Sequence, residues 1–355
     1  MTAVVEGPGV LAETRAFNAE LERTAAAGPP RHTVPVEELR RARRDGTDAF
    51  PPPVYRTDRA RELSIRGRSG DVGLRVIAPQ RDAVGAYLYI HGGGWALGAA
   101  DLQDAVLVEL ADATGLCAVS VEYRLAPEHP YPAGADDCED AALWLLREGF
   151  DELQVPPAAT IGGDSAGGHL SAVTLLRLRD RHASVGSFVA ANLIYGVFDL
   201  SLTPSVRNWG DRPLILTTPM MRLYGEWLLP GTDDDAKRDP DVSPLYADLQ
   251  DMPPALFTIG TLDPLLDDTL FMEARWRAAG GRTELRVWPE AAGEAFAGAC
   301  TPTSAGKGEL RVSCQSAVWA QELDLFSERV LERLNDLLDG ERVERMRVKT
   351  GAPPS

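Results

Sequence analysis

A serine enclosed by glycines constrains this chain more than any other feature. Residues 163–167 have the sequence Gly-Asp-Ser-Ala-Gly, a G-x-S-x-G pattern at a predicted strand-to-helix junction. The glycines allow the sharp turn that exposes the Ser165 hydroxyl, and a helix that begins there points unpaired N–H groups at developing negative charge. The pattern is typical of a nucleophilic serine, and by itself it fits a glycine-rich turn with a capping serine equally well.

A second glycine-rich sequence favours the nucleophile. Residues 91–95 are His-Gly-Gly-Gly-Trp, and they follow the apolar run 85–90, whose continuous hydrophobicity predicts a strand covered on both faces. Three glycines offer backbone N–H groups that no side chain obstructs, as an oxyanion hole requires. We interpret His91 as an anchor of its own loop, and His129 and His169 as residues that fix local structure. The two sequences together predict acyl chemistry on a carbonyl group.

Composition limits the partners of this chain. The formal net charge of −17 disfavours nucleic acid and anionic membrane surfaces, because the general field repels both. No run of eighteen apolar residues occurs, and the first nine residues lack the basic and apolar segments of a signal peptide. The four cysteines have neither CxxC spacing nor the density of a disulfide scaffold. We therefore expect a cytoplasmic protein that acts on a small molecule without a metal or cofactor.

The order of predicted elements indicates an α/β protein with additions. Residues 1–55 are predicted to form cap helices, over 10–24 and 35–44, ahead of a body that spans 56–340 and alternates strands with helices. A polar and aromatic insertion, at about 196–242, is a candidate cap over the carboxyl ends of the strands. A helix is predicted over 316–338, and a mobile tail over 341–355. The predicted strands are 61–65, 74–78, 85–90, 117–123, 158–162, 187–195, 255–260 and 283–287.

Further motifs extend the pattern over most of the chain. They are Tyr-Arg-Leu-Ala-Pro-Glu-His-Pro-Tyr-Pro-Ala at 123–133, a second glycine after the serine motif at 168, Ser-Pro at 243–244 and Asp-Pro-Leu-Leu-Asp-Asp at 263–268. With these, the chain resembles the hormone-sensitive-lipase-like family of α/β-hydrolases, which includes bacterial carboxylesterases and plant carboxylesterase-like proteins. The resemblance implies an α/β-hydrolase fold, with a mostly parallel eight-stranded sheet, helices on both faces and a helical cap.

The resemblance also implies roles for single residues. Ser165 would be the nucleophile, Asp263 the triad acid, and the N–H groups of Gly92, Gly93 and Ala166 the oxyanion hole. The family places its histidine after the last strand, between a proline and a phenylalanine. Counting back two residues from the phenylalanine at 296 gives Glu294, or Gly293 if the loop carries an inserted residue, and no histidine follows residue 182. The triad is therefore predicted to lack its histidine.

Three functions remain open at this point. The first is a carboxylesterase-like enzyme for a small, hydrophobic ester, with ordinary hydrolysis weak or lost. The second uses Glu294 and Asp263 as an acid and base pair, as in a dehydratase, lyase or cyclase of secondary metabolism. The third is a ligand receptor or an inactive homologue. Trp95, Trp209 and Tyr224 are candidate pocket residues, although the last two equally suit packing within a helical cap, and a homodimer is compatible with the sequence.

Overall fold

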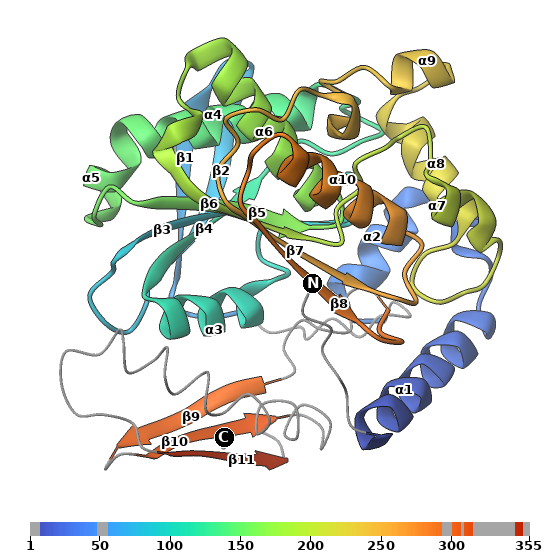
Figure 1. Ribbon diagram of the computed structural model, residues 1–355, viewed down its shortest axis with the longest axis horizontal. Coiled ribbons are helices and arrows are strands. Elements are labelled where there is room, and N and C mark those ends of the chain that lie inside the picture. Colours follow the sequence, from blue (N-terminus) through green and yellow to red (C-terminus); the bar gives the residue numbers. More distant parts are fainter. Residues whose placement is uncertain (1–7, 48–55, 293–299, 307–308, 315–344, 351–355) are drawn as a thin grey trace.

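The central sheet has the strand order β1-β2-β4-β3-β5-β6-β7-β8 (Figure 1). The structure is a computed structural model that describes residues 8–47, 56–292, 300–306, 309–314 and 345–350. β2 pairs antiparallel with β1 and β4, and every later pairing in this sheet is parallel. This arrangement confirms the predicted α/β-hydrolase fold with its mostly parallel eight-stranded sheet.

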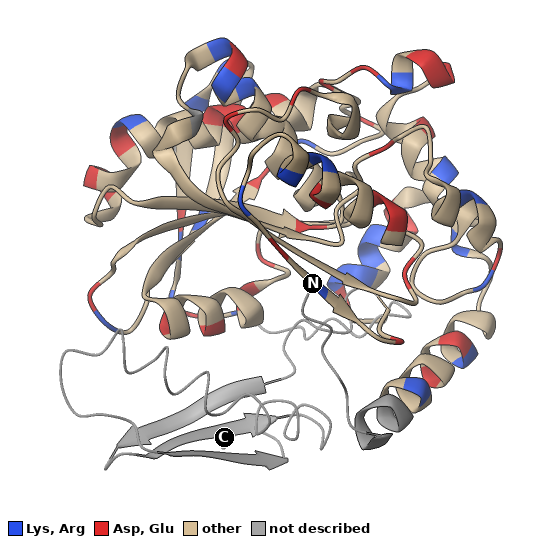
Figure 2. Cartoon of the chain, viewed as in Figure 1, with Lys and Arg blue, Asp and Glu red and all other residues tan. Residues whose placement is uncertain are grey.

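The strands lie close to their predicted positions because their apolar runs are buried. β3 is buried along its whole length, as its unbroken apolar sequence predicts. Figure 2 shows the charged residues gathered mainly on the helices and loops around the sheet. The strands are β1 (Ala60–Gly67), β2 (Gly70–Ile77), β3 (Gly85–Ile90), β4 (Leu116–Glu122), β5 (Ala159–Asp164), β6 (Phe188–Ile194), β7 (Ala255–Gly260) and β8 (Thr283–Trp288).

Helices cover both faces of this sheet (Figure 1). α3 (Asp104–Thr114) lies on one face and ends at Gly115, whose φ of 76° suits a glycine cap. On the other face lie α4 (Ala133–Trp144), α6 (Ala166–His182) and α10 (Leu266–Ala278). α4 continues through a π-helical turn, η2 (Leu145–Gly149), into α5 (Phe150–Leu153), and η3 (Val185–Ser187) precedes β6. α6 is the longest helix of this layer, with 17 residues.

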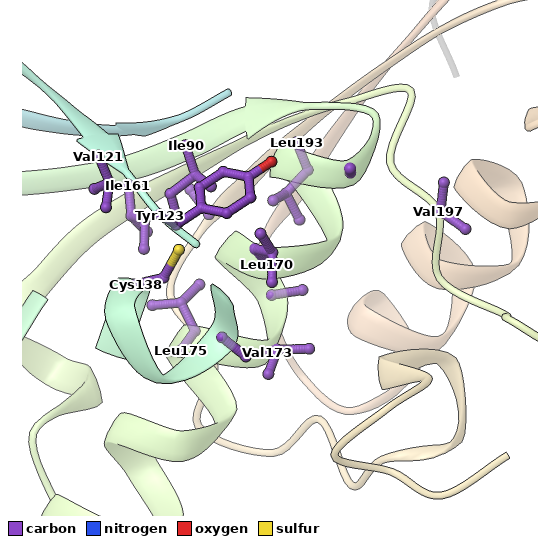
Figure 3. Close-up of a cluster of buried hydrophobic side chains, with 14 of the residues drawn as sticks. Ile90, Val121, Tyr123, Cys138, Ile161, Leu170, Val173, Leu175, Leu193 and Val197 are labelled. Atoms are coloured by element: carbon purple, nitrogen blue, oxygen red, sulfur yellow. The ribbon is translucent and has the colours of Figure 1, made fainter. Parts of the chain in front are cut away.

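The main core lies between the sheet and the layer of α4 and α6. Figure 3 shows one residue from each of four neighbouring strands gathered with α6 and α4, namely Ile90, Val121, Ile161 and Leu193 with Leu170, Leu175 and Cys138. Cys138 and Cys117 are buried free thiols, and burial raises the pKa of both. Such thiols behave as small apolar residues and not as nucleophiles.

The N-terminal region and the insertion contribute further helices. The first comprises α1 (Pro8–Ala26), η1 (Arg31–Thr33) and α2 (Val36–Arg44), and the second comprises α7 (Pro204–Trp209), α8 (Thr218–Leu228) and α9 (Asp234–Lys237), followed by η4 (Pro244–Tyr246). The Thr217 side chain caps α8 by accepting from the Met220 amide, and Asp233 caps α9 in the same way. An ion pair between Arg212 and Glu22 joins the insertion to α1.

A second sheet follows the eight-stranded one in the sequence. It comprises β9 (Cys300–Gly306), β10 (Glu309–Cys314) and β11 (Arg345–Thr350), in the order β11-β10-β9. In the described part of the chain, none of its strands pairs with the central sheet. The sequence analysis placed a mobile tail from residue 341, whereas β11 pairs in parallel with β10. The helix predicted over 316–338 lies outside the described residues.

Among the residues that the structure describes, no helix has the length and apolar character needed to cross a membrane.

Two valines allow a matched test of the core. Val119 of β4 is fully buried, whereas Val189 of β6 is 56% exposed. Val119→Ala should lower the free energy of unfolding by about 2 kcal/mol, because it removes buried methyl groups and leaves a cavity. Val189→Ala should change it by less than about 1 kcal/mol. Urea unfolding measures both values, and equal losses would contradict the assignment of β4 to the core.

Candidate active site

Ser165 occupies a strained turn between β5 and α6. Its φ of 53° and ψ of −116° are rare for a residue with a side chain, and such strain persists only where neighbouring contacts hold it. The Ser165 N–H donates to the Ile194 carbonyl at 2.9 Å, and the Ser165 carbonyl accepts from the His169 N–H at 3.1 Å. The turn therefore holds the partly exposed serine at the N-terminus of α6.

Gly163 and Gly167 must be glycines, because the Ser165 turn lies very close to the end of β3. A Cβ added at Gly163 or at Gly167 would lie far closer to the Ile90 carbonyl oxygen than real Cβ atoms come. Ile90 is the last residue of β3, so the turn packs directly against the end of that strand. This contact brings Ser165 next to the loop that follows β3.

That loop, residues 92–94, contacts the serine turn through Asp164. Tyr89 Oη and the Gly92 N–H both donate to Asp164 Oδ1, the latter at 3.1 Å. Gly93 and Gly94 have φ values of 107° and 59°, which glycine adopts without strain. We call residues 92–94 the oxyanion loop. Its Gly92 N–H, one of the predicted donors, is engaged by Asp164.

The other two predicted donors, the N–H groups of Gly93 and Ala166, make no comparable hydrogen bond to a described residue. Within the described residues, neither the Gly93 N–H nor the Ala166 N–H donates to a protein acceptor. Ala166 is the first residue of α6, whose opening N–H groups have no partner inside the helix. Both N–H groups thus stand available to an oxygen bound beside Ser165.

Arg40 of α2 binds the chain just after the oxyanion loop, at Ala96. Its guanidinium donates to the Ala96 carbonyl at 2.7 Å and to the Ala126 carbonyl at 2.8 Å, and it binds both carboxylate oxygens of Glu128. The Arg40 hydrogen bond lowers the pKa of Glu128 to about 2. The sequence analysis missed Arg40, because this arginine lies 56 residues before Ala96 and no local motif connects them.

The two buried histidines near the serine have structural partners. His91 Nδ1 lies 2.9 Å from the Gly92 carbonyl, and its ring stacks on Tyr123 with centroids 4.2 Å apart. His169 bonds through both ring nitrogens, to Trp95 and to the Val242 carbonyl. Burial lowers the pKa of each histidine to about 4. The sequence analysis gave both residues a local structural role, but it did not find the partners of His169.

Asp263 lies beyond β7 at the same edge of the sheet as Ser165. β5 and β7 are parallel and separated only by β6, so their carboxyl ends meet at one edge. Asp263 is 3% exposed, and its Oδ1 accepts from the Leu265 N–H at 2.8 Å. This position suits an acid that orients a proton carrier placed between it and the serine.

The chain after β8 returns alongside the residues that precede Asp263. The Thr261 N–H donates to the Trp288 carbonyl at 2.9 Å, and the Leu262 N–H donates to the Ala291 carbonyl at 3.1 Å. Ala292 is buried in a small cluster with Leu21 and Leu214. Glu294 and Gly293, the two candidates for the histidine position, lie outside the described residues.

The three candidate pocket residues differ in their surroundings. Tyr224 of α8 lies flat on the oxyanion loop, since a Cβ added at Gly94 would be 2.6–2.7 Å from three atoms of its ring. Trp95 is 3% exposed, and its indole N–H donates to His169. Trp209 packs against the cluster of Leu21, Leu214 and Ala292. Tyr224 is thus the candidate in direct contact with the oxyanion loop.

Among the residues that the structure describes, no group of three or more histidine, cysteine, aspartate or glutamate side chains is arranged to hold a metal ion.

The fold defines an α/β-hydrolase. A family model described as alpha/beta hydrolase fold, Abhydrolase_3, matches residues 87–295, which is more than half of the chain. The chain belongs to this family, and its motifs place it in the hormone-sensitive-lipase-like branch as a carboxylesterase-like hydrolase.

Curated relatives and solved structures agree with this assignment. The chain is 37% identical to carboxylesterase NlhH of Mycobacterium tuberculosis over 223 residues, which are 62% of this chain and 69% of that protein. It is 30% identical to an ethyl acetate hydrolase of Pseudomonas putida over 284 residues, covering 76% and 86%. A hyperthermophilic esterase from the archaeon Pyrobaculum calidifontis superposes with a TM-score of 0.70 at 30% identity, covering 82% of this chain and 91% of the esterase.

A second family model matches the C-terminal part of the chain. It is described as Dna[CI] antecedent, DciA, and it covers residues 261–348, about a quarter of the chain. The two matches overlap over 261–295, where the hydrolase match ends. The second sheet lies wholly beyond that point.

The depressed pKa of His169 predicts a pH-dependent stability. Between pH 6.5 and about 4 the unfolded chain holds a proton on this histidine that the folded chain lacks, so stability falls as pH falls through this range. Each histidine of this kind contributes a slope of about 1.4 kcal/mol per pH unit. His169→Asn should therefore flatten the slope of unfolding free energy by that amount, measured by urea unfolding between pH 4.5 and 6.

The decisive quantity is the difference in this slope between the wild-type protein and His169→Asn. Burial raises the pKa of Asp268 to about 7, so this carboxyl loses stability as pH rises between about 4 and 7 and opposes the histidine slope. Asp268 is present in both proteins, and its contribution cancels in the difference. An unchanged slope in His169→Asn would show that His169 is protonated in the folded chain.

Proposed function

We propose that this chain is an esterase that uses Ser165 to attack a small, hydrophobic carboxylic ester. The observation that carries the proposal is the packing of the strained Ser165 turn against the end of β3 through Gly163 and Gly167, and against the oxyanion loop through Gly92. Such close packing places a hydroxyl beside N–H groups that have no acceptor among the described residues, which is the arrangement that a tetrahedral intermediate requires.

In the proposed reaction, Ser165 Oγ forms a bond to the carbonyl carbon, and the negative charge moves onto the carbonyl oxygen. The Gly93 and Ala166 N–H groups donate to that oxygen. The Gly92 N–H, which the resemblance also implies as a donor, would first have to leave Asp164 Oδ1. The bond to the alcohol then breaks, and water releases the acid from Ser165 in a second addition and elimination.

Each half of this reaction needs a proton carrier, and we propose Glu294 for that position. Residues 291 and 292 run beside Leu262, so the chain approaches position 294 from the neighbourhood of Asp263. A glutamate with an ordinary pKa of about 4.3 accepts a serine proton poorly at neutral pH. Removing the histidine from a serine-protease triad costs about 10⁶-fold in turnover, while the oxyanion hole and binding retain about 10³- to 10⁴-fold over water. We therefore expect slow hydrolysis.

The relatives support hydrolysis ahead of an elimination or cyclisation. These relatives are named carboxylesterase, ethyl acetate hydrolase, acetyl esterase and esterase. The ethyl acetate hydrolase and the acetyl esterases act on short acyl esters by name, and we extend that substrate class to this chain. No described contact favours the acid and base pair of the second hypothesis.

Labelling of the serine tests the first step by itself. A fluorophosphonate probe should modify Ser165 in the full-length protein, because fluoride leaves without a proton and the reaction needs a base only for the serine proton. Mass spectrometry of the labelled peptide identifies the site. Ser165→Ala should abolish both the labelling and any release of nitrophenol from short-chain nitrophenyl esters. Release of nitrophenol that persists at the wild-type rate in Ser165→Ala would exclude the proposed nucleophile.

Restoring an imidazole tests the proton carrier. Glu294→His should raise kcat on nitrophenyl acetate by about 10² or more, since a positioned acid and base contributes about 10²- to 10⁴-fold. Glu284→His, at an exposed position of β8, is the matched control and should give no increase. If Ser165 is labelled and neither variant gains activity, position 294 does not occupy the place of the histidine.

A further inference from the structure

We propose that His169 is a positioning residue, whose imidazole locks the oxyanion loop to the nucleophile helix and to the end of the cap insertion. The inference rests on the proposed function, because an oxyanion loop has work to do only if Ser165 attacks a carbonyl. It assigns a catalytic consequence to a residue that touches neither substrate nor the reacting atoms.

The position of His169 couples three parts of the site. It lies one helical turn after Ser165 in α6, and its side chain is fully buried. His169 Nδ1 lies 3.0 Å from the indole Nε1 of Trp95, the residue directly after the oxyanion loop. His169 Nε2 lies 2.7 Å from the carbonyl oxygen of Val242, the last residue of the insertion.

These partners fix the protonation state of the ring. An indole N–H only donates and a carbonyl oxygen only accepts, so His169 Nδ1 must be the acceptor and Nε2 must carry the hydrogen. A second proton on Nδ1 would point at the indole N–H of Trp95. The site therefore uses a neutral imidazole as a rigid, two-ended connector.

Trp95 needs this connector because its backbone is strained. Its φ of 59° lies in the left-handed region, which is rare for a bulky residue and costs of order 1–3 kcal/mol. Besides its packing in the core, two hydrogen bonds hold it there, namely the bond from the Ala126 N–H to the Trp95 carbonyl at 3.0 Å and the bond from the indole to His169. Losing the second lets the peptide that joins Gly94 to Trp95 relax, which turns the oxyanion loop.

The insertion reaches the same loop by a second route. Tyr224 of α8 covers Gly94, and Asp241, directly before Val242, accepts from the buried Arg177 guanidinium of α6 at 2.8 Å. The end of the insertion is thus anchored independently of His169. That anchor makes the Val242 carbonyl a fixed point against which the imidazole can hold Trp95.

Two substitutions separate the two ends of the connector. His169→Asn can place an amide oxygen near the position of Nδ1 and so keep an acceptor for Trp95. His169→Gln can place an amide N–H near the position of Nε2 and so keep the bond to Val242, while it loses the acceptor for Trp95. Both variants are uncharged, and both remove the same ring.

The rate of Ser165 modification by diethyl nitrophenyl phosphate and kcat for nitrophenyl acetate are the first readouts. His169→Gln should lower both rates about 10- to 100-fold with KM within about twofold, because a displaced oxyanion donor weakens only the transition state. His169→Asn should stay within about threefold of wild type. Trp95→Phe should reproduce the loss, and adding it to His169→Gln should cost little more.

Backbone amide chemical shifts give a readout that needs no activity. The Gly93, Gly94 and Ala166 amide signals should move in His169→Gln and Trp95→Phe, and stay near their wild-type positions in His169→Asn. If the wild-type protein neither reacts nor hydrolyses, the proposed function fails and these shifts alone decide the inference. Equal effects of the Asn and Gln variants on rates and shifts, with equal losses in melting temperature, would overturn it, because they would show a role in packing alone.

Discussion

The close approach between the turn after β5 and the end of β3 is the constraint on which the site depends. Gly163 and Gly167 both face the Ile90 carbonyl, and any Cβ at either position would push the turn away from β3. Gly92 faces Asp164 in the same manner from the opposite side. Because the parallel order places β3 directly beside β5, two loops separated by seventy residues become one surface. The chemistry proposed for Ser165 follows from that contact.

Buried charges then attach the surrounding helices to this surface. The guanidinium of Arg177 is 2% exposed and binds Asp241 near the end of the insertion, together with Asp136 and Glu139 of α4. A buried arginine is costly unless carboxylates accompany it, so movement of the end of the insertion would remove one of the three carboxylates that balance Arg177. Arg40 performs the corresponding task for α2 at Ala96 and Ala126. The cap helices therefore belong to the architecture of the site.

The sequence predicted those parts of the fold that local patterns determine. The eight central strands follow from apolar runs, and the Ser165 turn follows from its glycines. The roles of Arg40 and His169 could not be predicted, because their partners lie tens of residues away and depend on the final packing. β9 was missed because its sequence, with Pro302 and a terminal Gly306, lacks both an apolar run and a regular alternation. The acidic total charge carried no information about the fold.

The hydrolase match ends at residue 295, so the expected place of the histidine falls at the boundary of the region that the family shares. The residues proposed to attack and to polarise a carbonyl lie before that boundary, at the ends of β3 and β5, and the proposed triad acid follows β7. Attack on an ester with a good leaving group makes small demands on a general acid, because the departing anion is stable without a proton. Release of the acyl group from Ser165 has no such relief, since the departing serine oxygen is a poor leaving group that must receive a proton. A chain with this distribution of parts should therefore acylate faster than it deacylates, and activated esters should give a burst of leaving group followed by slow turnover.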